Sequence, residues 1–327
     1  MHFSELLDKF MQQAQLSTTE LAKHLQINRH TVRRWRSGEI ARPNCKSIIA
    51  SLKYLKLNRY QCQQLLRAAG CSHVPMSILL DSPEQPLSPF VVGMPITHPA
   101  QFCGRETVIK KIASVWRYLP LQNIAVIGQA RCGKSSLLHY LKQILPQQLF
   151  PDYRVILIDF KEARMRKQSS LLSYLLNALE LPVLTDCSLI HFEEILGYHT
   201  IEHPTLILMD DIDYGLASDD LPREFWLGIR SIQHNYCYGR LGFLLSSKQE
   251  PAKIAQDVGK SSPFFNVFGY QVDLAPFTDK EAQNLINRSP IKFSQADRQK
   301  IIREAAGAPE RLQSLCLSHL HQLNDEV

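Results

Sequence analysis

The residues with the clearest chemical pattern lie at positions 128–135, where the sequence reads GQARCGKS. This run fits the spacing G-x-x-x-x-G-K-[ST] in full, and it stands between the apolar run NIAVI and the helical pattern SSLLHYL. Glycines at these positions let backbone N–H groups surround phosphate oxygens, and the start of the following helix adds positive potential. The sequence therefore predicts a loop that binds the phosphates of a nucleotide.

The polar residues of this loop have distinct expected roles. We expect Lys134 to bridge the β- and γ-phosphates and to act in catalysis, and to be mostly solvated when no nucleotide is bound. The Ser135 hydroxyl is expected to ligate Mg²⁺. Cys132 is either a reactive thiol at a helix N-terminus or a neutral filler at a variable position. The predicted nucleotide contacts here are Gly128, Gln129, Ala130, Arg131, Cys132, Gly133, Lys134, Ser135 and Ser136.

A second chemical pattern is the run TLILMDD at 205–211, an apolar strand that ends in two acids. The carboxyl ends of parallel strands lie together at one edge of a sheet, beside the phosphate loop. Asp210 is therefore the expected Mg²⁺ ligand, and Asp211 is the candidate to orient or deprotonate the attacking water. The alternative is an ordinary solvated strand end.

Two weaker patterns could complete a catalytic site. The run GRLGFLLSS at 239–247 predicts a strand between the two already described, which would put Ser246 and Ser247 near the γ-phosphate. We assign the catalytic role to Ser247, although serine is also common at strand ends. Three arginines could act as fingers on a neighbouring copy or simply form surface salt bridges. They are Arg223, Arg230 and Arg240.

The elements that must position these residues form an α/β pattern from residue 101 onward. Short apolar runs alternate with helical patterns, which predicts a parallel sheet flanked by helices, with both sheet faces covered. The runs are 123–127, 154–160, 205–210, 240–246 and 270–274. Only helical pattern follows Phe277. We therefore predict a nucleotide-binding core over 101–277 and a small helical lid over 278–327.

Residues 1–71 show helical periodicity and predict a separate all-α, helix-turn-helix domain. Ser17 and Glu20 have capping-box spacing, and Asn28 can cap a second helix that turns Val32 and Trp35 inward and stops at Gly38. The outward side chains of that second helix suit the DNA major groove. They are Arg29, His30, Arg33, Arg34 and Arg36.

The charge distribution supports a polyanionic partner for this domain. Residues 1–70 carry twelve Lys or Arg and four Asp or Glu, a net +8, whereas the whole chain carries +6. All the excess positive charge therefore lies in the first fifth of the chain, and duplex DNA is the expected partner. The alternative is a solvated basic face on a domain that binds a protein.

Composition sets the remaining expectations. Residues 72–100 hold six of the 18 prolines and predict a semi-rigid linker. We expect no membrane segment and no secretory signal, and hence a cytoplasmic protein. The eight cysteines form no Cys-x-x-Cys pair, so we expect reduced thiols rather than a zinc site or a disulfide framework.

These motifs together resemble known families. LSTTELAKHLQINRHTVRRWRSGEIARP at 16–43 is similar to Cro/repressor-type helix-turn-helix domains, although Arg36 stands where that family often has an acid. Residues 101–320 resemble the ATPases of the STAND and AAA+ type, which implies ATP and Mg²⁺ as cofactors. FCGRETVIKKI at 102–112 resembles the element that contacts the adenosine end, which implies nucleotide roles for Gly104 and Arg105. GAPERLQSL at 307–315 resembles the lid motif, in which Pro309 would lie against the base.

Two departures from the ATPase pattern affect the expected mechanism. Asp211 stands where AAA+ machines usually have Glu, and no clear sensor arginine follows Pro309, although Arg311 is two residues away. We expect ATP turnover to be slow.

The combined patterns predict an ATP-binding and ATP-hydrolysing switch that acts on DNA and forms ATP-dependent homo-oligomers, with a protein effector as a further possible partner. Its outlet could be transcription regulation, defence or target selection by a mobile element. The alternative is a nucleotide-dependent scaffold with negligible turnover, whose helix-turn-helix docks a protein. A kinase fits less well, because the paired acids and the Gly-x-Pro lid are typical of ATPases.

Overall fold

The computed structural model describes residues 2–40, 43–57, 59–71, 87–150, 152–183 and 187–325. The chain divides into two compact units, Met1–Pro86 and Leu87–Val327, each with its own hydrophobic core. In the described residues no helix is long and apolar enough to cross a membrane.

The N-terminal unit is helical. Its helices are α1 (Phe3–Gln13), α2 (Thr18–His24), α3 (Arg29–Arg36), α4 (Cys45–Leu55) and α5 (Arg59–Ala68). The expected caps are present, because Ser17 and Glu20 form the capping box of α2 and the Asn28 carboxamide oxygen accepts the His30 N–H at the start of α3. Val32 and Trp35 are buried in the core, as the sequence predicts, so α2 and α3 form a helix-turn-helix.

A cysteine pair in this unit differs from the expectation of reduced thiols. Cys45 opens α4 and Cys71 follows α5. Packing of α4 against α5 brings their Cα atoms to 5.6 Å, and the two sulfur atoms form a disulfide bond. The pair is 26 residues apart in sequence. No short motif marks it, so only the packing reveals it. The other six cysteines are free thiols.

The second unit contains a five-stranded parallel sheet in the order β2-β3-β4-β1-β5. The strands lie within one or two residues of the five predicted runs, and β4 pairs with both β1 and β3 as expected. Their bounds are β1 Ile124–Ile127, β2 Arg154–Asp159, β3 Thr205–Asp210, β4 Leu241–Ser247 and β5 Tyr270–Asp273. β3 and β4 are buried along their whole length, whereas β5 forms an exposed edge.

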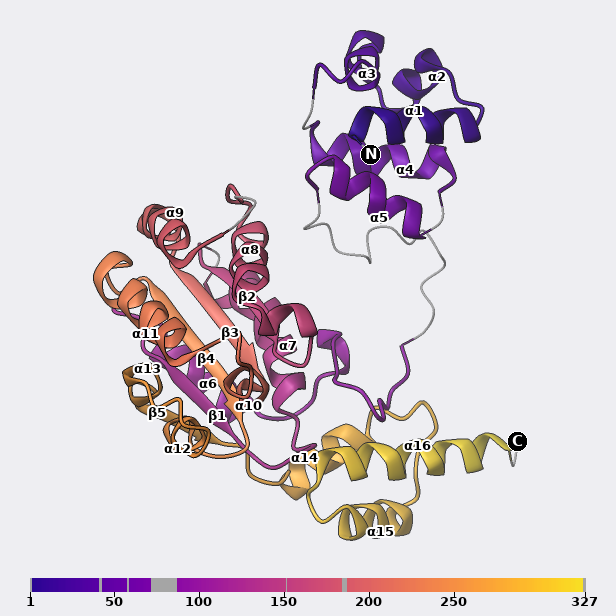
Figure 1. The fold of residues 1–327 in the computed structure, drawn as a ribbon. Coiled ribbons are helices and arrows are strands. Elements are labelled where there is room, and N and C mark those ends of the chain that lie inside the picture. The colour runs from indigo at the N-terminus through magenta and orange to yellow at the C-terminus, as the bar shows by residue number, and fades with distance from the viewer. Residues whose placement is uncertain are drawn as a thin grey trace. The chain divides into compact units, whose positions relative to one another are not determined.

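Helices cover both faces of this sheet (Figure 1). One face packs on α6 (Glu106–Val115) and α7 (Lys134–Ile144), and α7 continues into η3 (Leu145–Leu149). The other face packs on the remaining core elements. These are η4 Ala163–Arg166, α8 Gln168–Ala178, α9 Leu189–Glu202, α10 Ile212–Leu216, α11 Arg223–Ser231, η5 Ile232–Tyr236, α12 Pro251–Asp257 and α13 Pro263–Asn266. The fold is the predicted α/β type, a parallel sheet flanked by helices, with the phosphate-binding loop (P-loop) between β1 and α7.

A helical lid follows β5, as predicted, and consists of α14 (Asp279–Ile286), α15 (Gln295–Ala305) and α16 (Pro309–Asp325). It has its own apolar cluster, and in Figure 1 it lies beyond the carboxyl ends of the strands.

The lid cluster also contains Phe90, only 1% exposed, from the region predicted to be linker. We call residues 87–98 the arm; it leads into η2 (Pro99–Gln101). The arm packs on this unit through Phe90, which is buried among the apolar side chains of the lid. The compact unit therefore begins at Leu87 rather than at residue 101, and the rest of the predicted linker, 72–86, lies outside the described residues.

Candidate functional site

A cavity of about 420 Å³ lies where the phosphate loop, the carboxyl ends of the strands, the lid and the arm meet. Most of the residues singled out from the sequence line it. From the loop and the start of α7 these are Ala130, Arg131, Cys132, Gly133, Lys134, Ser135 and Ser136, and they are joined by Arg105, Asp211 and Pro309. Gly104, Gly128, Gln129, Asp210 and Ser247 are not among the lining residues.

The phosphate loop needs its glycines for two different reasons. A Cβ at Gly128 would come within 2.6 Å of the Cys132 sulfur, and Gly133 has φ +98° at the N-cap of α7, a conformation that side chains disfavour. Arg131 also has a left-handed backbone, with φ 65°. The loop therefore needs a glycine at both positions to turn into the N-terminus of α7, and a helix N-terminus of this kind can hold phosphate.

Lys134 does not match the expectation of a solvated side chain. It is only 7% exposed, and its Nζ donates to the carbonyl oxygens of Gly128 (2.7 Å) and Gln129 (3.0 Å). The side chain folds back over the loop, where the two carbonyls satisfy the ammonium group. Gln129 thus contributes its carbonyl to the lysine, and its own side chain is exposed.

The acidic pair lies where the sequence predicts, at the end of β3. Asp210 is 4% exposed, and its Oδ1 accepts a hydrogen bond of 2.5 Å from the Ser246 hydroxyl. Burial raises the pKa of Asp210, and the hydrogen bonds from Ser246 and Ser135 oppose that rise. Asp211 has φ 51° in the turn after β3, and it lines the cavity together with residues of the phosphate loop.

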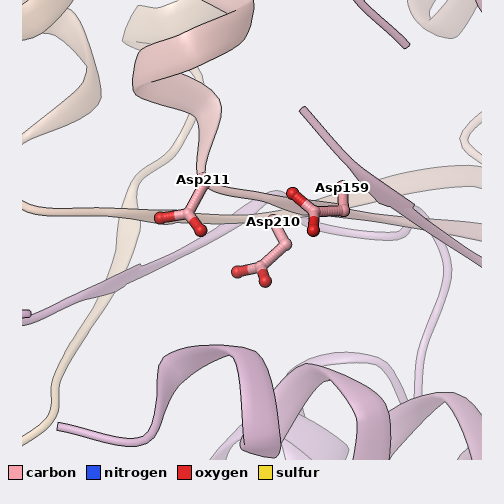
Figure 2. A group of neighbouring side chains, drawn as sticks. All are labelled: Asp159, Asp210 and Asp211. Atoms are coloured by element: carbon pink, nitrogen blue, oxygen red, sulfur yellow. The ribbon is translucent and has the colours of Figure 1, made fainter. Parts of the chain in front are cut away.

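Asp159, at the end of β2, completes an acidic group and was not predicted from the sequence. One oxygen each from Asp159, Asp210 and Asp211 lie within 4.8 Å of one another, and Figure 2 shows the three carboxyl groups together at the carboxyl edge of the sheet. Oxygen donors of this kind fit Mg²⁺, which prefers one or two carboxylates beside phosphate and water. The acid at the end of the run RVILID was the available signal.

Lys161 was also missed. It follows β2 and forms an ion pair with Asp211, and this contact is the main cause of the raised pKa of Lys161. It lines the cavity with Tyr214, whose ring lies 5.9 Å from the Lys161 ammonium. A cation therefore already neutralises the proposed catalytic acid.

Ser246, rather than Ser247, is the serine that touches the acidic pair. Its hydroxyl donates to Asp210 and accepts the Asp211 N–H at 2.9 Å. The Ser247 hydroxyl donates to the Gln249 carbonyl, because alternate residues of a strand face opposite sides. The assigned catalytic role of Ser247 has no support in this geometry.

The segment around Gly104 and Arg105 is tied to the lid. A Cβ at Gly104, where φ is +73°, would meet the Glu281 side chain of α14 at 2.9 Å, and the Arg105 N–H donates to Glu281 at 2.7 Å. The Arg105 guanidinium donates to the carbonyls of Ala275 and Cys132 and lies 4.7 Å from the Phe277 ring centre. Arg105 therefore joins the phosphate loop to the lid junction.

The lid reaches the phosphate loop through the first turn of α16. Pro309 lines the cavity, and Glu310 forms an ion pair with Arg131 at 3.2 Å. The arm closes another side with Val91, Gly93, Met94, Pro95 and Ile96, and the Ser136 hydroxyl accepts the Ile96 N–H at 3.0 Å. Ser136 thus holds the arm.

Two of the three arginines considered as fingers donate hydrogen bonds to backbone carbonyls of their own chain. Arg223 donates to the Ser261 carbonyl, and Arg230 to the Pro263 carbonyl. Arg240 is partly buried just before β4.

The five recognition-helix residues are all exposed, but they fall into two groups. Arg34 pairs with Glu39, and Arg36 donates to Asp8 and Thr18, so it ties α3 to α1 and α2. Arg29, His30 and Arg33 have no partner among the described residues, and with Thr18 and Thr19 they line a polar groove of about 680 Å³. These three are the side chains left available to a ligand.

Fold and site together define a helix-turn-helix unit followed by a P-loop ATPase unit. Residues 6–59 match the family model described as a Cro/C1-type HTH DNA-binding domain, and residues 121–250 match the one described as an AAA domain. The chain thus carries a Cro/C1-type helix-turn-helix domain and an AAA domain. Comparison with curated proteins finds no match.

Solved structures support the same fold. The Walker-type ATPase PABY2304 of Pyrococcus abyssi superposes with a TM-score of 0.51 at 15% identity, covering 71% of this chain and 75% of its own. The ORC1 protein of Aeropyrum pernix, solved with DNA, superposes with a TM-score of 0.52 at 14% identity, covering 69% of this chain and 62% of its own. The ORC2 protein of the same organism superposes with a TM-score of 0.53 at 14% identity, covering 65% of this chain and 60% of its own. This chain thus spans less than two thirds of either ORC protein.

Proposed function

We propose that this protein binds and slowly hydrolyses ATP and acts as a DNA-associated switch of the STAND/AAA+ type. The observation that carries the proposal is the single cavity lined by Lys134 and Ser135 of the phosphate loop, Asp211 of the acidic pair and Pro309 of the lid. A nucleotide in that cavity would contact the core and the lid together. Its phosphates could therefore control the position of the lid relative to the core.

The residues have separate roles in this proposal. Lys134 leaves the loop carbonyls to bind the β- and γ-phosphates, and Asp211 orients or deprotonates the attacking water. Ser135, Asp210 and Asp159 would hold Mg²⁺, whose charge neutralises the phosphates. Ser246 positions the Asp210 carboxylate through its hydrogen bond of 2.5 Å.

Duplex DNA is the proposed partner of the N-terminal unit. The support is the exposed face of α3, where Arg29, His30 and Arg33 are free of protein partners among the described residues. ATP-dependent oligomers would bring several such units to one DNA and raise their combined affinity. The outlet would be transcription control, defence or target selection by a mobile element.

Two measurements test the proposal: the ATPase rate with and without duplex DNA, and the particle mass by light scattering in ADP and in ATP. We expect DNA to stimulate turnover and ATP to increase the mass. If DNA does not change the ATPase rate and ATP does not change the particle mass, the proposed switch is wrong.

A scaffold with negligible turnover is the alternative, with the helix-turn-helix docking a protein. The observation that favours it is the ion pair between Lys161 and Asp211, which occupies the carboxylate needed to activate water. In that case ATP would bind at the cavity, but single-turnover experiments would detect no phosphate release.

A further inference from the structure

Where the arm and the lid bound the cavity, it is mostly apolar. Val91, Met94, Pro95, Ile96, Phe277 and Pro309 line it. Among the described lining residues of the arm and the lid, two side chains are polar, and one of them, Glu310, is engaged with Arg131. The other is Gln313, which lies one helical turn after Pro309 on the same face of α16.

The orientation of the Gln313 carboxamide follows from its hydrogen bond. The backbone N–H of Val91 donates to Gln313 Oε1 at 3.1 Å. Only the oxygen of a carboxamide can accept that proton, so the NH₂ group must lie on the other side. The arm therefore fixes which end of the amide is available.

The NH₂ group of Gln313 has no protein acceptor among the described residues, although the residue is only 6% exposed. Nε2 keeps some solvent-accessible surface. Gln313 lines the cavity, so this nearly buried, fixed side chain carries an unpaired donor beside the ligand space. A donor in such a place costs free energy unless a ligand or water accepts from it.

We propose that Gln313 is a specificity-determining residue that reads the base of the bound nucleotide, with Nε2 donating to a ring-nitrogen acceptor of adenine. This inference rests on the proposed ATP site and adds to it the group that recognises the base. The apolar lining packs on the faces of the ring, and the amide supplies direction. Because the same amide holds Val91, an occupied base site also joins the arm to the lid.

The test uses a substitution that keeps the shape. Gln313→Glu retains an oxygen for the Val91 N–H and replaces the donor by a carboxylate oxygen. We expect it to weaken ATP binding by about tenfold to a hundredfold, the range for a lost hydrogen bond that leaves acceptors facing each other. Calorimetry measures the affinity, and thermal unfolding checks that the variant is folded.

The matched control is Gln143→Glu. Gln143, on α7, also ties the arm by donating to the Thr97 carbonyl at 2.6 Å, but it does not line the cavity. This variant should bind ATP like the wild type. If Gln143→Glu weakens ATP binding as much as Gln313→Glu does, the loss comes from the displaced arm, and the base-reading role of Gln313 is overturned.

Ligand analogues keep the inference falsifiable even if Gln313→Glu does not fold. Wild-type protein should bind one of 1-deaza-ATP, 3-deaza-ATP and 7-deaza-ATP about tenfold or more weakly than ATP, because that analogue lacks the accepting nitrogen. Gln313→Glu should not distinguish that analogue from ATP. Equal wild-type affinity for ATP and all three analogues would overturn the inference while leaving the ATP site intact. A wild-type protein that binds no nucleotide would overturn the proposed function as well.

Discussion

Lys134 and Asp211 face one cavity from different elements, and both are engaged with the protein itself in this structure. Lys134 bonds to loop carbonyls and Asp211 to Lys161. In the proposed mechanism, each exchanges that protein partner for the nucleotide or its water. Single substitutions at these two residues therefore separate loss of ATP binding from loss of hydrolysis.

We expect Lys134→Ala to abolish ATP binding, because the phosphates lose the cation that the loop is built around. The variant should remain folded, since the lysine bonds to loop carbonyls rather than to the core. Calorimetry gives the affinity and thermal unfolding the stability. Lys142→Ala is the control, because Lys142 is on the same helix outside the cavity. Wild-type affinity in Lys134→Ala would contradict the site.

Asp211→Asn should keep ATP bound but slow its turnover by roughly 10²-fold or more, the scale of a lost general base. The amide cannot accept the water proton, whereas Asp210 and Ser135 remain to hold Mg²⁺. Asp213→Asn, two residues later and outside the cavity, is the matched control and should turn over normally. If the two variants have equal rates, the catalytic carboxylate is not Asp211.

At the scale of elements, α3 divides into residues that hold the domain together and residues available to DNA. The double variant Arg29→Ala, Arg33→Ala removes the available arginines, one helical turn apart. If both contact phosphate, the slope of log affinity against log salt should fall by about two units. If one reads a base, sequence preference should also relax, at a cost of about 1–3 kcal/mol.

The control for this prediction changes the same charge elsewhere. Lys46 on α4 and Arg67 on α5 are exposed outside the α3 groove, so replacing both with Ala should leave most of the affinity. The basal ATPase rate should survive in both double variants, because the ATPase unit has its own core. Full DNA affinity without Arg29 and Arg33 would instead locate the DNA contact on the ATPase unit.

At the scale of the whole molecule, the boundary between the units is a testable quantity. A fragment of residues 87–327 should fold and bind ATP, whereas 101–327 should unfold at lower temperature and bind ATP weakly. The shorter fragment lacks Phe90, whose burial contributes about 1.5–3 kcal/mol, and the arm that lines the cavity. Thermal unfolding and calorimetry on both fragments check this. If the two fragments have equal unfolding temperatures and equal ATP affinities, the folded ATPase unit begins at residue 101 instead.

The sequence alone determined the local parts of this protein. The phosphate loop, the acids that end β3, the five strands and the caps of α2 and α3 all follow from short-range patterns, because turns, caps and buried strands each need particular residues at fixed spacing. The strand order also followed in part, since β4 was expected beside β1 and β3.

The tertiary structure decided what depends on contacts between distant segments. Asp159 and Lys161 join the site only because β2 pairs with β3, and Ser246 rather than Ser247 touches Asp210 because of the strand's pleat. A proline-rich composition indicated a linker, yet lid packing makes part of it a wall of the nucleotide cavity. Such contacts have no local signal, because their free energy comes from burial and hydrogen bonds between residues far apart in the chain.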